Sequence, residues 1–135
     1  DAGQKKKGEE KNNSIAKQAK MLPKINRIKK KKDFEEIFKK AKSFKNNLLI
    51  FRMAKNGQGI NRFGFVVSLK ISKKATIRNK IRRRLAEAVK TDGKDIKSGT
   101  DLILIALPGI EKKEFTEIKK SLSAGLFALG ATLKD

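Results

Sequence analysis

The chain of 135 residues contains no cysteine, histidine, tryptophan or tyrosine. Without thiols or imidazoles it cannot build a disulfide framework, a thiolate nucleophile, an imidazole base or an ordinary zinc site. It also has no apolar run of about 18 residues that would span a bilayer. No apolar stretch near residue 1 resembles a secretory signal. We therefore expect a cytoplasmic protein without a membrane partner.

Acidic residues are scarce beside the basic ones: 14 Asp and Glu stand against 35 Lys and Arg, which gives a net charge of +21. In so short a chain this charge causes self-repulsion on folding, and a polyanion that supplies counter-charge relieves it. The obvious polyanion is nucleic acid. The length and the 38% of apolar residues indicate one domain with a modest core.

Residues 1–20 differ from the rest because they are polar and almost lack β-branched and aromatic side chains. We predict that they form a disordered basic extension, which is either a genuine arm or a remnant left by cloning. Met21 begins a segment that looks like a natural start. Six lysines and three acids give residues 1–20 a charge of +3, so residues 21–135 carry the other +18. The basic character therefore belongs to the domain at 21–135.

An amphipathic helix is predicted over residues 33–42, because its apolar residues recur at i, i+3, i+4 and i+7. Asp33 and Glu36 have the spacing of a capping box at its N-terminus. The acids near its start and the lysines near its end also suit the helix dipole.

Two strand-like runs follow at 48–54 and 61–69, and the Asn56-Gly57 dipeptide between them is typical of a hairpin turn. A short strand near residues 43–45 is weakly indicated.

The second half of the chain predicts a helix at 75–90, a buried strand at 101–107 and a helix at 111–130. Gly125 and Gly130 weaken the C-terminal half of the last helix. The order of helices and strands indicates an α+β domain, with a mostly antiparallel sheet that has its helices on one face.

The densest chemical signal lies in residues 68–90. On a helical projection the apolar residues share one face, and cations surround a single amide on the other. The residues expected to bind a polyanion are Lys70, Lys73, Lys74, Arg78, Asn79, Lys80, Arg82 and Arg83. The alternative is the solvated face of an ordinary helix, but Glu87 is the only acid, so alternating ion pairs do not account for the run. A phosphate-binding site at the helix N-terminus is also expected from Lys73, Lys74 and Thr76. The alternative is that Thr76 only caps the helix.

The aromatic residues are eight phenylalanines. Phe34 and Phe38 of the first helix, with Ile50 and Arg52 of a strand, would form a shallow apolar floor on which unstacked bases lie. The alternative is that both phenylalanines are plain core, which their spacing alone favours.

Several short motifs, in this order, resemble the protein subunit of bacterial ribonuclease P. They are Met21-Leu22-Pro23-Lys24, Asn26-Arg27, Asp33-Phe34, Arg62-Phe63-Gly64-Phe65, Lys73-Lys74-Ala75-Thr76, Arg78-Asn79-Lys80-Ile81-Arg82-Arg83 and Pro108-Gly109. The motif at 78–83 is the most specific of them, and the resemblance covers residues 21 to about 130. Four residues depart from the family pattern, namely Arg52, Leu69, Ala86 and Leu107.

The resemblance implies a single α-β-β-β-α-β-α domain of the ribosomal protein S5 domain 2-like kind, with a left-handed βαβ crossover that departs from the usual hand. It implies that the protein is an accessory subunit without catalytic or metal-binding residues of its own. The catalytic RNA subunit and its Mg²⁺ ions would cleave the 5′ leader from precursor tRNA. The eight residues at 70–83 would bind the catalytic RNA, and no obligate protein partner is expected. The residues implied at the leader are Arg27, Phe34, Phe38, Ile50 and Arg52.

Two other functions remain open from the residues alone. A structural RNA-binding protein of ribosomal type has the same basic composition. A stand-alone nuclease would need clustered carboxylates for Mg²⁺, and Asp92, Asp95 and Asp101 show no paired-carboxylate motif.

Overall fold

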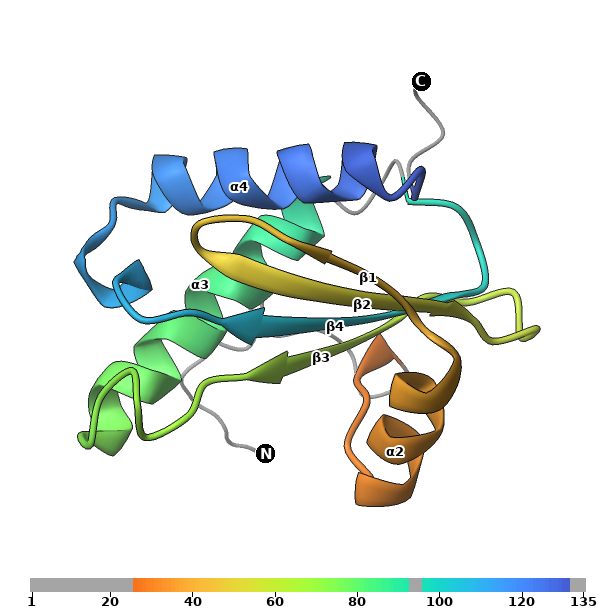
Figure 1. The fold of residues 1–135 in the computed structure, drawn as a ribbon, viewed down its shortest axis with the longest axis horizontal. Coiled ribbons are helices and arrows are strands. Elements are labelled where there is room, and N and C mark those ends of the chain that lie inside the picture. The colour runs from red at the N-terminus through yellow and green to blue at the C-terminus, as the bar shows by residue number, and fades with distance from the viewer. Residues whose placement is uncertain (1–25, 93–95, 132–135) are drawn as a thin grey trace, which may run out of the picture.

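The computed structural model of the protein describes residues 26–92 and 96–131, which form a sheet of four strands with helices against it (Figure 1). The predicted extension over residues 1–20 lies outside the described residues. In chain order the elements are α2 (Lys31–Lys40), β1 (Lys42–Lys45), β2 (Leu49–Lys55), β3 (Arg62–Val66), α3 (Ala75–Asp92), β4 (Thr100–Ala106), the 3₁₀ helix η4 (Ile110–Lys112) and α4 (Phe115–Ala128). This order confirms the predicted α+β arrangement, including the weakly indicated first strand.

The strands are arranged in the order β1-β2-β4-β3, with β3 and β4 parallel and the other pairs antiparallel. The predicted hairpin between β2 and β3 is therefore wrong, because β4 lies between them. The residues of β4 are almost all buried, as expected for a strand that is covered on both faces at the centre of a sheet. Gly57 has the expected positive φ of 71°, but its turn carries the chain past β4.

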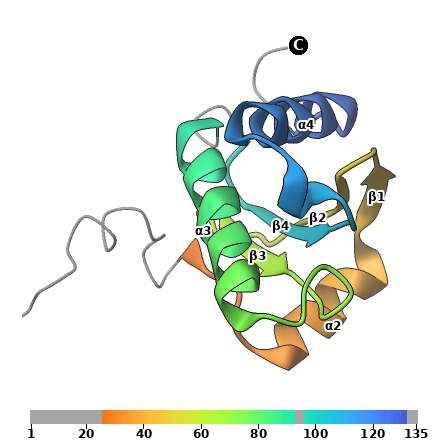
Figure 2. The same ribbon diagram turned by 90° about the vertical axis from the view of Figure 1, so that its left-hand side faces the viewer.

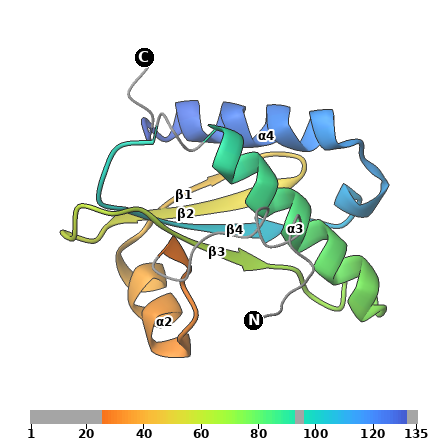
Figure 3. The same ribbon diagram turned by 180° about the vertical axis from the view of Figure 1, so that it is seen from behind.

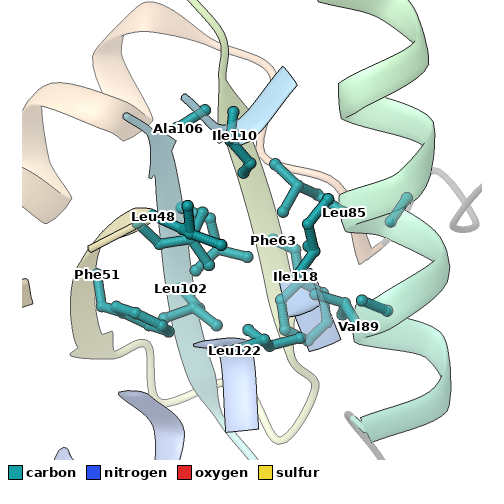
Figure 4. Packing of buried hydrophobic residues seen from close by; sticks show 14 of the residues in the cluster. Leu48, Phe51, Phe63, Leu85, Val89, Leu102, Ala106, Ile110, Ile118 and Leu122 are labelled. Atoms are coloured by element: carbon teal, nitrogen blue, oxygen red, sulfur yellow. The ribbon is translucent and has the colours of Figure 1, made fainter. Parts of the chain in front are cut away.

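Helices cover both faces of the sheet, whereas the sequence predicted them on one. Helices α3 and α4 pack on one face, and α2 lies against the opposite face (Figures 1 and 2). The larger core joins α3 and α4 to inward residues such as Phe51, Phe63 and Leu102 (Figure 4). A smaller cluster of Ile37 with Ile103 fixes α2 beneath β2 and β4. On the same side of the sheet, Ile50 and Arg52 of β2 are only half-buried.

The predicted capping box at Asp33 is wrong. Helix α2 begins two residues earlier, at Lys31, and its N-cap residue Lys30 makes no side-chain cap hydrogen bond. Asp33 instead lies in the first turn, with its carboxylate 3.8 Å from a terminal nitrogen of Arg62. The last helix begins later than predicted, at Phe115, because η4 occupies the first residues of the expected span.

A polar cluster around Asp101 locks the start of β4 to β3. Arg62 donates two hydrogen bonds to the buried carboxylate, from Nε at 2.9 Å and from Nη2 at 2.7 Å. Asn56 donates a third at 2.8 Å, from the loop after β2. The hydrogen bond to Asp101 raises the pKa of Arg62, so the guanidinium stays charged. The cluster satisfies a carboxylate that would otherwise be costly to bury.

We expect Asp101→Asn to lower the free energy of unfolding by about 1.5 to 3 kcal/mol, because hydrogen bonds to charged groups contribute that much. Urea denaturation would measure the change. Asp92→Asn is the matched control, since Asp92 accepts only an exposed hydrogen bond from Ser123 at 3.2 Å among the described residues. Equal losses for the two variants would contradict a stabilising role for the cluster.

Candidate nucleic-acid interface

The turn between β3 and α3 holds three of the predicted lysines in solvent. Ile71 anchors it by burying its side chain in the larger core, and its backbone N–H donates to the carbonyl of Ser68 at 3.0 Å. Lys70, Lys73 and Lys74 are all exposed around this anchor. Their backbone positions are therefore fixed while their ammonium groups stay free to reach an anion.

Arg78 and Arg82 tie this turn to α3. Arg78 donates from Nη1 to the carbonyl of Ser72 at 3.0 Å, and Arg82 donates from Nη2 to that of Val67 at 3.5 Å. Arg82 also donates to the side chain of Asn79 at 2.6 Å. Both arginines are half-buried, so they support the turn as well as adding charge to it. Sequence reasoning did not detect this supporting role, because a helical projection shows no contact beyond the helix.

The rest of α3 follows the predicted pattern. Ile81, Leu85 and Val89 are buried, whereas Asn79, Lys80 and Arg83 are exposed. The structure therefore brings the eight predicted residues together at the N-terminal half of α3 and the preceding turn (Figure 3). We call them the basic surface: Lys70, Lys73, Lys74, Arg78, Asn79, Lys80, Arg82 and Arg83. Thr76 lies inside the first turn of α3, so the alternative in which it only caps the helix is wrong.

The predicted aromatic floor lies on the α2 side of the sheet. The ring centroids of Phe34 and Phe38 are 6.4 Å apart, and the guanidinium carbon of Arg52 lies 5.5 Å from the Phe38 centroid. Ile50 is two residues from Arg52 on the same strand face and is half-buried. We call these four residues the aromatic face. Phe38 is 37% exposed, so it is reachable from solvent and is not plain core.

Gly64 makes room for the aromatic face. A Cβ atom at this buried position of β3 would lie 2.8 Å from two ring carbons of Phe34, which is too close for the ring to keep its place. The glycine therefore lets Phe34 lie directly on the sheet. Phe34 is half-buried there, so it supports the smaller core and borders the aromatic face at once.

Arg52 is one of the four residues that depart from the family pattern, and its contacts show what an arginine does at this position. Arg52 stacks on the Phe38 ring as a cation–π pair. Its Nε atom is buried and has no acceptor within the described part of the chain. The Arg52 guanidinium therefore packs beside the Phe38 ring and keeps a hydrogen-bond donor that no described residue uses.

Arg27 lies apart from the β2 part of the aromatic face, Ile50 and Arg52. It lies on the outer edge of β3, where it forms an isolated parallel bridge with Phe63, whereas Arg52 lies on β2 beyond β4. Conversely, the sequence missed Lys45, which is exposed and lies opposite Ile50 in the β1–β2 register. Cross-strand partners share a face, so Lys45 borders the aromatic face. Only the register could have indicated it.

Two of the three acids considered for a protein-only nuclease form hydrogen bonds to neighbouring side chains. Asp101 is held by Arg62 and Asn56, and Asp92 accepts a hydrogen bond from Ser123. Asp95 lies outside the described residues. Within 26–92 and 96–131, no group of three acidic side chains is placed to hold a metal ion. No helix in these ranges is long and apolar enough to cross a membrane.

Comparison with known proteins places this geometry in a family. The family model described as Ribonuclease P matches residues 22–130. The Ribonuclease P protein component of Alkaliphilus oremlandii is 37% identical over 98 residues, covering 73% of this chain and 85% of the relative. That of Syntrophomonas wolfei is 35% identical over 120 residues, covering 85% of this chain and all of the relative.

Solved structures agree with the sequence relatives. The RNase P protein of Staphylococcus aureus superposes with a TM-score of 0.73 at 31% identity, covering 79% of this chain and 97% of that one. The RNase P protein of Thermotoga maritima gives a TM-score of 0.67 at 30% identity, covering 73% and 92%. Both the order of elements and the motifs at 62–65 and 78–83 lie within the matched region. The chain therefore belongs to the ribonuclease P protein family.

Proposed function

We propose that the protein is the RNA-binding subunit of a ribonuclease P in which the RNA subunit performs catalysis. The basic surface binds the catalytic RNA, and the aromatic face binds the single-stranded 5′ leader of precursor tRNA. The observation that supports this best is the presence of two different RNA-binding chemistries on one small domain. One surface is a cluster of cations, and the other pairs the exposed Phe38 ring and the half-buried Phe34 ring with an arginine beside Phe38.

The basic surface suits an RNA backbone that is already folded. Its cations sit on a helix and an anchored turn, so they are positioned before binding and lose little backbone freedom. Neutralising phosphates also lets the catalytic RNA and a negatively charged substrate approach each other. Mg²⁺ would be held by the RNA subunit and the substrate, and the protein would promote cleavage by lowering their mutual repulsion.

The aromatic face suits a strand whose bases are unpaired. Base stacking on rings tolerates any sequence, because every base has a π face. Arg52 and Lys45 would contact the adjacent phosphates, since both border the rings. The aromatic face contains no Asn or Gln to read base edges. We therefore expect leader binding that depends on length and salt more than on sequence.

Single-turnover cleavage of a precursor tRNA with a 5′ leader tests the proposal. The reaction is run at near-physiological Mg²⁺ and salt with cognate RNA alone, protein alone, or both. We expect efficient cleavage at the mature 5′ end only with both. Binding of RNA without any change in cleavage would favour a structural RNA-binding protein instead, and metal-dependent cutting by protein alone would favour a nuclease.

Phe38→Ala should weaken leader binding about 5- to 150-fold, since stacking on a side chain contributes about 1 to 3 kcal/mol per base. The loss should vanish on a precursor whose leader has been shortened so that it cannot reach the aromatic face. Phe127→Ala is the control, because Phe127 is 65% exposed and lies on α4, across the sheet. An equal effect of Phe38→Ala on long and short leaders would show that the aromatic face does not bind the leader.

A further inference from the structure

A second aromatic site lies where α3 meets the start of α4, on the side of the sheet opposite the aromatic face. A hollow of about 240 Å³ is lined by Lys80, Arg83, Arg84, Glu87 and Phe115. The phenylalanine begins α4 and is only half-buried, so its ring forms the apolar part of the wall. Lys80 and Arg83 already belong to the basic surface. The hollow is therefore an aromatic extension of that surface.

The Phe115 ring is partly exposed to solvent and lies close to positively charged side chains. The Lys119 ammonium nitrogen lies 5.7 Å from the Phe115 centroid, which places another cation beside the hollow. Arg84 is held in place by a hydrogen bond from Nη1 to the carbonyl of Lys113 at 3.3 Å. Cations around one aromatic ring are the chemistry that takes a nucleobase by its face and the flanking phosphates by their charge.

Three glutamates lie near the hollow, and only one of them, Glu87, lines it. Glu114 and Glu117 form the capping box of α4, which directs their side chains to backbone N–H groups. Glu117 also pairs with Lys113 at 4.0 Å. Glu87 lines the hollow itself, and a carboxylate at that place accepts hydrogen bonds from an exocyclic amine, as on cytosine or adenine.

We propose that this hollow binds one unstacked base of the catalytic RNA, with its ring on Phe115 and its neighbouring phosphates on Lys80, Arg83 and Arg84. The occupant is a base that offers an exocyclic amine to Glu87. This inference rests on the proposed function, because it takes the basic surface to face the catalytic RNA. It adds a specific contact to a surface that otherwise recognises backbone charge alone.

The test measures binding of the cognate catalytic RNA by fluorescence anisotropy, together with chemical probing of each base in the same complex. Phe115→Leu keeps an apolar side chain against the core but removes the ring, and Phe115→Tyr keeps the ring. Phe127→Leu, at an exposed position on the same helix, is the matched control. Thermal unfolding of each variant verifies that the fold is retained.

We expect Phe115→Leu to weaken RNA binding about 5- to 100-fold, and Phe115→Tyr and Phe127→Leu to leave it unchanged. One base protected by the wild type and by Phe115→Tyr should become reactive with Phe115→Leu at saturating protein. Unchanged affinity and protection with Phe115→Leu would overturn the inference while leaving the proposed function intact. A uniform loss of protection over all bases would also overturn it. If the wild-type protein fails to bind the RNA, the proposed function itself is wrong.

Discussion

Replacing Lys73, Lys74, Lys80 and Arg83 together with alanine is expected to weaken binding of the catalytic RNA about 100- to 500-fold at physiological salt. All four side chains are exposed and rest on an anchored turn or on α3. If each contacts one phosphate, each adds about 0.7 to 0.9 to the slope of log K against log salt. The slope should therefore fall by about 3 in the variant. Titrations at several salt concentrations measure both quantities.

The choice of these four residues follows from the structure. Arg78 and Arg82 carry the family motif, but they also hold the carbonyls of Ser72 and Val67. Their removal would move the turn that carries Lys73, so a lost affinity would not report contact alone. Within residues 26–92 and 96–131, the side chains of the four chosen residues make no such hydrogen bond. Their loss should therefore leave the thermal midpoint nearly unchanged.

A charge-matched control separates local contact from general attraction. A second variant replaces four exposed lysines elsewhere with alanine, namely Lys55, Lys97, Lys112 and Lys120. Both variants lose the same net charge, so long-range steering falls equally in both. We expect the fold-change in RNA binding of the control variant to be less than about a tenth of that of the first variant. Equal losses would show that RNA is held by the field of the whole protein and that the basic surface is not the interface.

The basic surface could be predicted because helical periodicity is a local property. Ile81, Leu85 and Val89 recur at helical spacing, so their burial and the exposure of Lys80 and Arg83 follow from the sequence alone. Strand order is not local in this sense. The Asn56-Gly57 turn has the same residues whether β3 pairs directly with β2 or lies on the far side of β4. The sequence therefore predicts a hairpin that the structure does not contain.

The contacts that sequence reasoning missed join residues far apart in the chain. Arg62 and Asp101 are 39 residues apart, and nothing in either neighbourhood predicts that they meet. The aromatic face was partly predictable, because Phe34 and Phe38 share a stripe of α2 and the alternation of a strand places Ile50 and Arg52 on one face. The contribution of Lys45 required the register of β1 on β2, and the hollow at Phe115 required the packing of α4 beside α3.

Gly125 shows how the same residue changes meaning between sequence and structure. In the sequence it only weakens a helix, since glycine is poor in helix interiors. In the structure it is buried in α4 directly over Phe51 of β2, a side chain with no exposed surface. A Cβ atom at Gly125 would lie 2.0 Å from Cζ of that ring. The glycine therefore sets the distance at which α4 docks on the sheet.

Gly125→Val is accordingly expected to lower the free energy of unfolding by about 3 kcal/mol or more, the upper end of the range for overpacked cores. The ring cannot turn away, because Phe44 packs against it with a centroid distance of 5.9 Å and the larger core surrounds it. Chemical denaturation monitored by circular dichroism measures the loss. Ala124→Val, at an exposed position of the same helix, controls for the helix propensity of valine.

A double-mutant cycle with Phe51→Leu identifies the cause. Shrinking the ring alone leaves a cavity and destabilises the protein, but in the Gly125→Val background it makes room for the added methyl groups. We expect the double variant to be more stable than the sum of the two single losses predicts. Strict additivity would mean that valine acts through helix propensity or the unfolded chain, and that Gly125 does not control docking. Because α4 also positions Phe115 beside α3, a shift of α4 in Gly125→Val should displace Phe115 from the hollow while Lys80 and Arg83 keep their places on α3.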